Sequence, residues 1–382
     1  MDEIHITPSV CFAPSRITRR AWTLATALHA LVFWAWPCAA APRAEVRRDL
    51  ILLDIDGLDA GQPTPSAAAA RAVRFDECFV PSDSKETNAL SLLTSAYVPS
   101  SPVRFGSTAF STGTATLPEL LRRDGYATAF FTVGPALGAP AGFDHYENAA
   151  ATATLHGLFE ESSRWMRSHR DEPFFLFLRA SASSPESALE FGTLWRRWNG
   201  DGTLRRAIVV LTSDAGAPGA PSLSDRALRV PLLAWLPDVH PGRIRSDVRL
   251  IDVAPSLLDW AGLPAEPAFS GAPLRLLSVD RRPTRRDVFA VAGTMDAGPR
   301  KFSLRHDGWK LVYDKSSGTA KLYDLKNDPD ETHDRADEYP EKALDLTQRL
   351  LRHIRDVDAG VVGRPEPASP ALIKALRSHG YW

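Results

Sequence analysis

Residues 207–234 read AIVVLTSDAGAPGAPSLSDRALRVPLLA. The apolar run at 207–211 is rich in β-branched residues and predicts a buried strand that ends in TSDAG at 212–216. A polar loop follows, and a second strand begins at Val230-Pro231. The carboxyl ends of strands in an open α/β sheet converge on a crevice lined by loops, so we expect Asp214 and Ala215 to lie where such a fold carries out its chemistry.

Strands and helices alternate upstream of this segment. Apolar runs predict strands at 50–56, 126–132 and 174–178. Predicted helices lie between them, at 67–72, around 90–93, from Thr116 to Gly125, and at 155–168. The alternation predicts an α/β fold with a largely parallel central sheet and helices on both faces.

The pattern changes after about residue 284. Short runs at 288–291, 301–305, 309–313 and 321–323 predict an antiparallel meander. An amphipathic helix is predicted at 340–355, with Leu344, Leu350, Leu351 and Ile354 on its apolar side. We therefore predict an α/β domain at 42–283, a small α+β lobe with an antiparallel sheet at 284–358, and a tail at 359–382.

The first forty residues are typical of a targeting segment. Three arginines, Arg16, Arg19 and Arg20, precede a stretch at 21–42 without charged residues, and Cys38-Ala39-Ala40 offers small residues for cleavage. Residues 1–40 are thus predicted to be a signal peptide of an exported protein, periplasmic or extracellular. An uncleaved membrane anchor is the alternative, although the apolar run is shorter than a typical span.

Composition limits the classes of partner. The 382 residues carry 45 basic and 46 acidic side chains, a net charge of −1. A nucleic-acid-binding surface depends on an excess of positive charge, so we expect no nucleic-acid partner. We expect membrane contact only through residues 1–40, if that segment stays uncleaved.

Several segments together resemble the sulfatase branch of the alkaline-phosphatase superfamily. They are, in chain order, LILLDIDGL at 50–58, FDECFVPSDSKETNALSLLTSAY at 75–97, TLPELLRRDGYATAFF at 116–131, GFDHYE at 142–147, PFFLFL at 173–178 and VRLIDVAPSLLDWAGLP at 248–264. The resemblance implies the sulfatase fold and a site that hydrolyses sulfate or phosphate esters. That site would hold a divalent metal, calcium or magnesium, on aspartates at two strand ends.

By this resemblance, Asp56 matches the first metal aspartate and Asp214 the second. The alternative for each is an aspartate that only caps a turn at a strand end. Asp54 lies two residues before Asp56 and therefore points to the same face. It is a further metal-ligand candidate, although the resemblance places no ligand there.

The nucleophile position of the family lies nine residues before the threonine of its leucine-leucine-threonine run. That threonine is Thr94, so the position is Lys85. A lysine is protonated near neutral pH, and an amine that did attack would form a stable bond to sulfur or phosphorus, so Lys85 is predicted to be inert. The neighbours Ser84 and Thr87 are candidate nucleophiles only if the helix register shifts. Cys78 lies seven residues too early and is predicted to be a buried thiol.

Family histidines are replaced at several positions. Phe105-Gly106 stands where the resemblance implies histidine-glycine, and Ser183 and Ala215 stand where it implies substrate-binding histidines. His145 and His306 lie elsewhere and are predicted to have surface or packing roles.

These losses favour an impaired or inactive hydrolase without a metal cofactor. Two buried carboxylates without a metal would repel each other unless a cation replaced the ion. We therefore predict that the Lys85 ammonium group lies within salt-bridge reach of Asp56 or Asp214. Three alternatives stay open. The first is an active metal-dependent sulfatase or phosphohydrolase with relocated ligands, the second is an exported protein that binds an unknown ligand or protein without catalysis, and the third is a purely structural exported protein.

Overall fold

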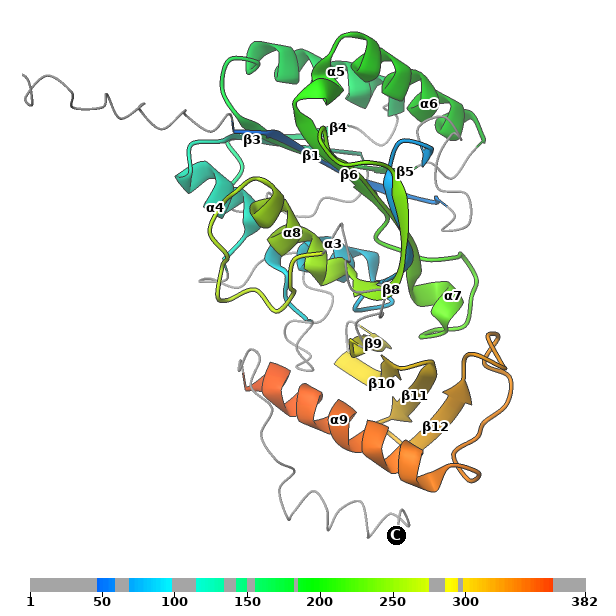
Figure 1. The fold of residues 1–382 in the computed structure, drawn as a ribbon. Helices are drawn as coiled ribbons and strands as arrows, with labels where there is room; N and C mark the ends of the chain where they lie inside the picture. The colour runs from blue at the N-terminus through cyan, green and yellow to red at the C-terminus, as the bar shows by residue number, and fades with distance from the viewer. Residues whose placement is uncertain are drawn as a thin grey trace, which may run out of the picture. The chain divides into compact units, whose positions relative to one another are not determined.

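Strand β1 lies in the middle of an eight-stranded sheet with the order β4-β3-β5-β1-β6-β7-β2-β8 (Figure 1). The computed structural model describes residues 47–58, 69–97, 115–133, 142–149, 155–181, 185–274, 286–294 and 298–359. The strands of this sheet are β1 (Asp49–Asp56), β2 (Val73–Phe79), β3 (Ala127–Val133), β4 (His145–Ala149), β5 (Phe174–Ser181), β6 (Ala207–Thr212), β7 (Arg229–Trp235) and β8 (Gly242–Arg249).

Most neighbouring strands in this sheet run parallel, and β7 alone is antiparallel to its two neighbours, β6 and β2. Alternate residues of β1 enter two different apolar clusters: Leu50 and Leu52 join one, and Ile51 and Leu53 the other. A strand that is buried on both faces has a continuous run of apolar residues. This is why the sequence of β1 was sufficient to predict the strand. The predicted α/β class is confirmed.

Helices cover both faces of the sheet, as Figure 1 shows. Helices α3 (Lys85–Thr94), α4 (Leu117–Arg123) and α8 (Val253–Trp260) pack on one face. Helices α5 (Leu155–Ser168) and α6 (Pro185–Gly200) pack on the other. The short elements are η1 (Thr203–Arg205), α7 (Asp225–Leu228) and η2 (Leu250–Asp252). Helix α4 begins as predicted, with Thr116 and Glu119 capping each other's backbone N–H groups.

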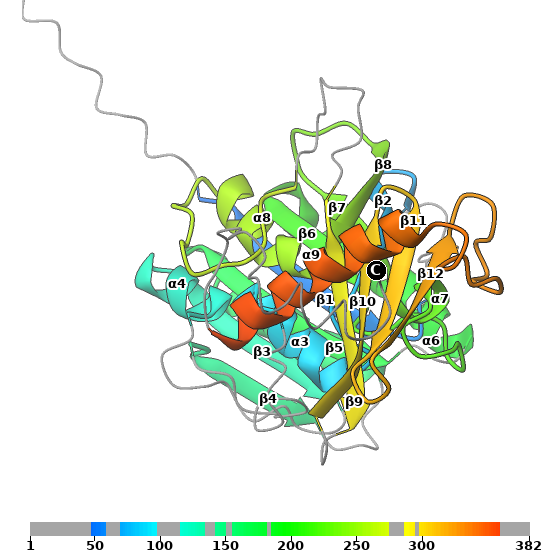
Figure 2. The same cartoon turned by 90° about the horizontal axis from the view of Figure 1, so that it is seen from below.

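A second sheet follows, with the antiparallel order β12-β11-β10-β9. Its strands are β9 (Val288–Thr294), β10 (Gly298–His306), β11 (Trp309–Asp314) and β12 (Thr319–Asp324), and helix α9 (Pro340–Asp358) lies across them (Figure 2). The antiparallel meander and its helix are confirmed. The buried stripe of α9 is Ala343, Leu346, Thr347 and Leu350, so the predicted Leu344 is only half-buried.

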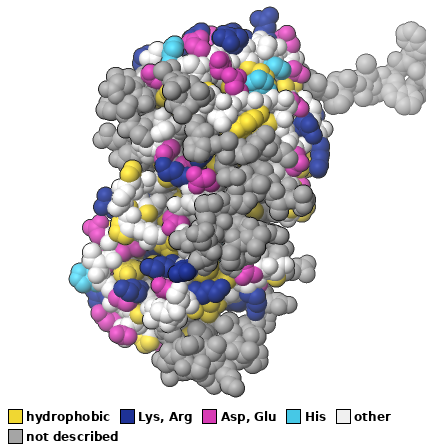
Figure 3. Space-filling view, turned by 180° about the vertical axis from the view of Figure 1, so that it is seen from behind, with side chains coloured by type: hydrophobic (Ala, Val, Ile, Leu, Met, Phe, Trp, Pro, Cys, Tyr) yellow, Lys and Arg dark blue, Asp and Glu magenta, His cyan; other side chains and the backbone are white. Residues whose placement is uncertain are grey.

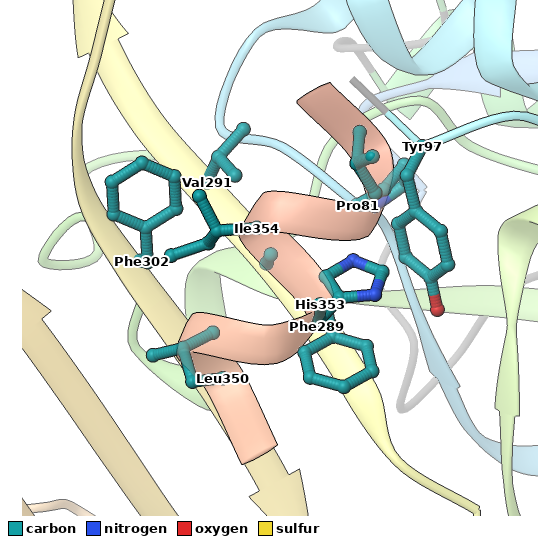
Figure 4. Close-up of a pocket in the computed structure, with 10 residues that line it drawn as sticks. Pro81, Tyr97, Phe289, Val291, Phe302, Leu350, His353 and Ile354 are labelled. Carbon is teal, nitrogen blue, oxygen red and sulfur yellow. The ribbon is translucent and has the colours of Figure 1, made fainter. Parts of the chain in front are cut away.

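Three ring side chains bring α9, β9 and the segment after α3 into contact (Figure 4). The imidazole of His353, on α9, stacks on Phe289 of β9 with 3.6 Å between ring centroids. The ring of Tyr97, which follows α3, meets the imidazole edge-on at 4.5 Å. Burial, with the nearby positive charge of Arg249, lowers the pKa of His353 to about 3. The imidazole is therefore neutral at physiological pH.

Several sequence predictions fall outside the described residues: the targeting segment at 1–40, Phe105-Gly106, Ser183 and the tail beyond residue 359. The domain division at residue 284 stays a prediction, because residues 275–285 are not described. Within the described residues, no helix combines the length and apolarity needed to cross a bilayer. On the face seen in Figure 3, acidic and basic side chains are interspersed, in keeping with the near-zero net charge.

Candidate functional site: an ion-pair network at the strand ends

The carboxyl ends of three central strands bring the candidate residues together. In the register of the sheet, Asp54 of β1 stands beside Arg179 of β5 and beside Thr212 of β6. Asp56 ends β1, and Asp214 follows β6 by two residues. Helix α3 packs on the face of the sheet to which Asp54 and Arg179 belong by strand parity.

Arg179 is the central cation of this site. Its Nη2 lies 2.5 Å from Asp214 Oδ2, and its Nε lies 3.0 Å from the same oxygen. The Nε atom also lies 3.4 Å from Asp54 Oδ2. All three side chains are nearly excluded from solvent, with 12% of the arginine and 1% of each carboxylate exposed. One guanidinium group thus bridges two buried carboxylates.

Lys85 supplies a second cation. It is the first residue of α3, and its Nζ lies 2.6 Å from Asp56 Oδ2. The predicted ion pair is therefore confirmed, with Asp56 as the partner. In contrast to the Arg179 cluster, this pair is accessible, because 48% of the lysine side chain is exposed. Partial burial lowers the pKa of Lys85, but the hydrogen bond and charge of Asp56 outweigh it and raise that pKa overall.

The five charged groups balance when one carboxyl group holds a proton. Burial, followed by the negative charge of Asp214, raises the pKa of Asp54 well above its usual range. Burial also raises the pKa of Asp214, although Arg179 opposes that shift. A protonated Asp54 leaves Asp214 paired with Arg179 and Asp56 paired with Lys85, so the network is neutral.

The hydroxyl group of Ser84 is engaged in the start of the helix, whereas that of Thr87 has no hydrogen-bond partner among the described residues. Ser84 is the N-cap of α3, and its Oγ accepts a hydrogen bond from Thr87 N at 3.4 Å and donates one to Glu86 at 3.2 Å. Thr87 is buried, with 5% of its surface exposed. The helix register thus places the Lys85 ammonium group beside Asp56.

The residue after Asp214 adds no polar side chain. Ala215 N donates to Ser213 Oγ, which in turn donates to Ala215 O at 2.9 Å. These two hydrogen bonds lie within the turn that carries Asp214. Ser183, the other position of an absent histidine, lies outside the described residues.

Cys78, His145 and His306 lie away from the ion-pair network. Cys78 is fully buried in the first apolar cluster, and burial raises the pKa of its thiol. The imidazole of His145 packs against Phe131 at 5.0 Å between ring centroids, and His306 Nδ1 lies 2.6 Å from Asp287 Oδ1. These placements confirm the buried thiol and the packing role of His145.

Two carboxylate oxygens at the strand ends are paired with side-chain cations, whereas Asp214 Oδ1 and both carboxyl oxygens of Asp54 have no hydrogen-bond partner among the described residues. A divalent metal ion binds carboxylate oxygens that are free to coordinate it. Here Asp214 Oδ2 and Asp56 Oδ2 each face a cationic nitrogen within 2.6 Å. A doubly charged ion would meet two fixed positive charges at this point. Across the described ranges, no group of three or more histidine, cysteine, aspartate or glutamate side chains is arranged to hold a metal.

Two residues of the site were missed in the sequence. Arg179 follows PFFLFL directly, and an arginine that continues a buried parallel strand is the signal that points to it. Asn88 of α3 is fully buried, and its amide donates to the carbonyls of Ser82 and Asp214 at 2.8 Å each. It thereby fixes the start of α3 against the turn that carries Asp214.

The exposed lysine pair is expected to contribute little to stability. Lys85→Met should lower the free energy of unfolding by about 1 kcal/mol or less, because exposed ion pairs gain little in water. Urea denaturation of both proteins measures this difference. A loss of several kcal/mol would instead mean that Lys85 supports the site structurally.

Sequence comparisons match parts of the chain to sulfatases. A family model described as N-sulphoglucosamine sulphohydrolase, C-terminal, matches residues 222–359. Arylsulfatase K of Xenopus laevis is 30% identical over 171 residues, which are 40% of this chain and 32% of that protein. Human arylsulfatase K is 28% identical over 165 residues, 38% of this chain and 31% of that protein. The chain thus spans about a third of the length of these curated relatives.

Structural comparisons extend over most of the chain. A protein solved with its substrate D-glucosamine-2-N,6-O-disulfate has a TM-score of 0.69 and 14% identity, covering 82% of this chain and 98% of that one. A phosphonate monoester hydrolase from Silicibacter pomeroyi has a TM-score of 0.69 and 16% identity, covering 82% and 97%. At such identity the likeness shows the fold.

The chain, with aspartates at the carboxyl ends of β1 and β6, shares the fold of these structural neighbours. The family-model match over part of the chain and the arylsulfatase K relatives support membership of the sulfatase family. Members of this family typically use a divalent metal, whereas the corresponding carboxylates of this chain are paired with side-chain cations.

Proposed function

We propose that this protein is a sulfatase-family member that does not hydrolyse esters. The observation that carries the proposal is the guanidinium of Arg179, which bridges the buried carboxylates of Asp54 and Asp214. It supplies within the protein the positive charge that a metal supplies in an active site of this family. The metal's other contribution, the stabilisation of anionic oxygens on a bound ester, is lost with it.

The nucleophile position supports the same proposal. Lys85 stands there as an ammonium group, hydrogen-bonded to Asp56 and without a lone pair for attack. The preceding residue, Ser84, uses its hydroxyl group to cap α3. Ala215 stands where the family resemblance implies a histidine, so a proton donor for the leaving group is absent at that position.

Ligand binding without hydrolysis is the role that the crevice best suits. Lys85 is half-exposed at the amino terminus of a ten-residue helix, where both the side chain and the helix dipole favour an anion. The ligand class we propose is a sulfate, phosphate or phosphonate ester. Two structural neighbours support it, since one was solved with a sulfated sugar and another is a phosphonate monoester hydrolase. Export through residues 1–40 belongs to the same proposal.

Metal analysis and an ester panel test the proposal together. Purified mature protein is expected to contain no stoichiometric divalent metal and to turn over no aryl sulfate, aryl phosphate or phosphonate monoester. Asp214→Asn is the control, because a residual rate that survives this change comes from a contaminant. Stoichiometric calcium with turnover that Asp214→Asn abolishes would establish the active hydrolase with relocated ligands instead.

A further inference from the structure

A cavity lined by tryptophan and arginine lies at the opposite edge of the main sheet from the ion-pair network. Trp235 ends β7 and pairs with Val209 near the start of β6, whereas Asp214 follows the end of β6. Arg205, at the end of η1, comes just before β6. Since β6 has six residues, the two sites are separated by roughly 20 Å, one strand length.

The size of the cavity suits a small organic molecule. Its volume is about 350 Å³, within the usual range for ligand pockets. One wall is built from Trp195 of α6 and Trp235, whose ring centroids are 4.3 Å apart and whose planes are inclined by 43°. Indole rings stack favourably on the flat face of another ring.

Two arginines give this cavity positive charge. Arg71 and Arg205 line it, together with His240 and Asn199, and no aspartate or glutamate is found among its lining residues in the part of the chain that the structure describes. Both arginines are exposed, and neither side chain has a hydrogen bond or ion pair with any residue the structure describes. Asp238, which is close in sequence, is engaged by Arg48. The two guanidinium groups are thus available to bind an oxyanion.

The Arg205 guanidinium group lies close to the backbone of Gly202. At this residue, which has a φ of +84°, an added Cβ would come within 2.4 Å of Arg205 Nη2.

We propose that this tryptophan–arginine cavity binds a ring compound that carries a single oxyanion group, such as a sulfate, sulfonate or carboxylate. The ring stacks on the tryptophan wall, and the oxyanion accepts hydrogen bonds from Arg71 and Arg205. Planar guanidinium groups suit such oxyanions because they donate in a fork. This cavity is separate from the ion-pair network at the strand ends. The proposal therefore holds whether or not that network supports catalysis.

Calorimetric titration with naphthalene-2-sulfonate tests the proposal. The full-length protein is expected to bind this probe more tightly than 2-naphthol, which offers the same rings without the anion. Arg71→Ala and Arg205→Ala should each weaken binding roughly 10-fold or more, the usual effect of losing a charge-assisted hydrogen bond. Asn199→Trp, at an exposed position on α6, should abolish binding by filling the cavity.

Two matched variants separate this site from others. Arg123→Ala removes an exposed arginine on α4, and Lys85→Ala removes the exposed cation of the family crevice; both should leave the affinity unchanged. Equal binding of 2-naphthol, binding that survives loss of both cavity arginines, or binding lost in Lys85→Ala would each overturn the proposal. Circular dichroism of every variant verifies that it is folded.

Discussion

Replacing Arg179 with methionine is expected to lower the free energy of unfolding by about 3–5 kcal/mol, the usual cost of breaking a buried ion pair from one side. The change leaves Asp54 and Asp214 buried without their cation, although methionine fills much of the arginine's volume. Urea denaturation at neutral pH measures the loss.

The matched control is Arg243→Met. Arg243 Nη2 also pairs with an aspartate, Asp76, at 3.0 Å, but 61% of the arginine side chain is exposed. This variant should lose about 1 kcal/mol or less. Equal losses of unfolding free energy in the two variants would mean that the buried ion pair contributes no more to stability than the exposed one.

A second substitution separates charge from packing in the Arg179 variant. Adding Asp214→Asn to Arg179→Met removes the carboxylate that Arg179 had paired, so the double variant should be more stable than Arg179→Met alone. Calcium should also stabilise Arg179→Met, and should leave the parent protein unaffected, because the variant frees carboxylate oxygens for the ion. If the double variant were the less stable of the two, loss of packing would explain the effect.

His353→Phe is expected to make the protein markedly more resistant to acid. The pKa of His353 is about 3 in the folded protein, below its ordinary value of 6.5. As pH falls below about 6.5, His353 becomes protonated in the unfolded chain but stays neutral in the folded protein. The free energy of unfolding therefore decreases until about pH 3, where the folded protein also binds the proton. At 1.4 kcal/mol per pH unit, the parent should lose on the order of 3 kcal/mol through this group by about pH 4.

Phenylalanine keeps the stack on Phe289 and removes the titrating group. Denaturation at neutral pH and at about pH 4 should therefore show a smaller acid-induced loss in His353→Phe than in the parent. His156→Gln is the control for the removal of a histidine, since the His156 side chain is 66% exposed on α5. Identical pH profiles for the parent and His353→Phe would contradict the neutral, buried state of the imidazole.

The sequence predicted the elements whose patterns are local. Buried strands such as β1 and β6 are continuous apolar runs, and the capping pair Thr116 and Glu119 marks the start of α4. Strands β2 and β8 were missed because charged residues interrupt them: β2 reads VRFDECF and β8 GRIRSDVR. Their polar side chains are accommodated toward the edge of the sheet, which only the sheet order reveals.

The sequence predicted one of the two cations of the site and missed the other. Counting along the chain located Lys85, and charge balance required a cation near the aspartates. The role of Arg179 depends on the pairing of β5 with β1, which sets it beside Asp54, and no local pattern encodes that register. The prediction therefore named one cation, and the structure contains two.

Crystals grown with manganese provide the most direct test of the central claim, that Arg179 and Lys85 take the place of the metal. Manganese prefers carboxylate oxygens and gives an anomalous signal. We expect the Arg179 guanidinium between Asp54 and Asp214, Lys85 Nζ on Asp56, and no anomalous peak at the strand ends. A manganese ion held by Asp56 and Asp214, with Arg179 displaced, would contradict it.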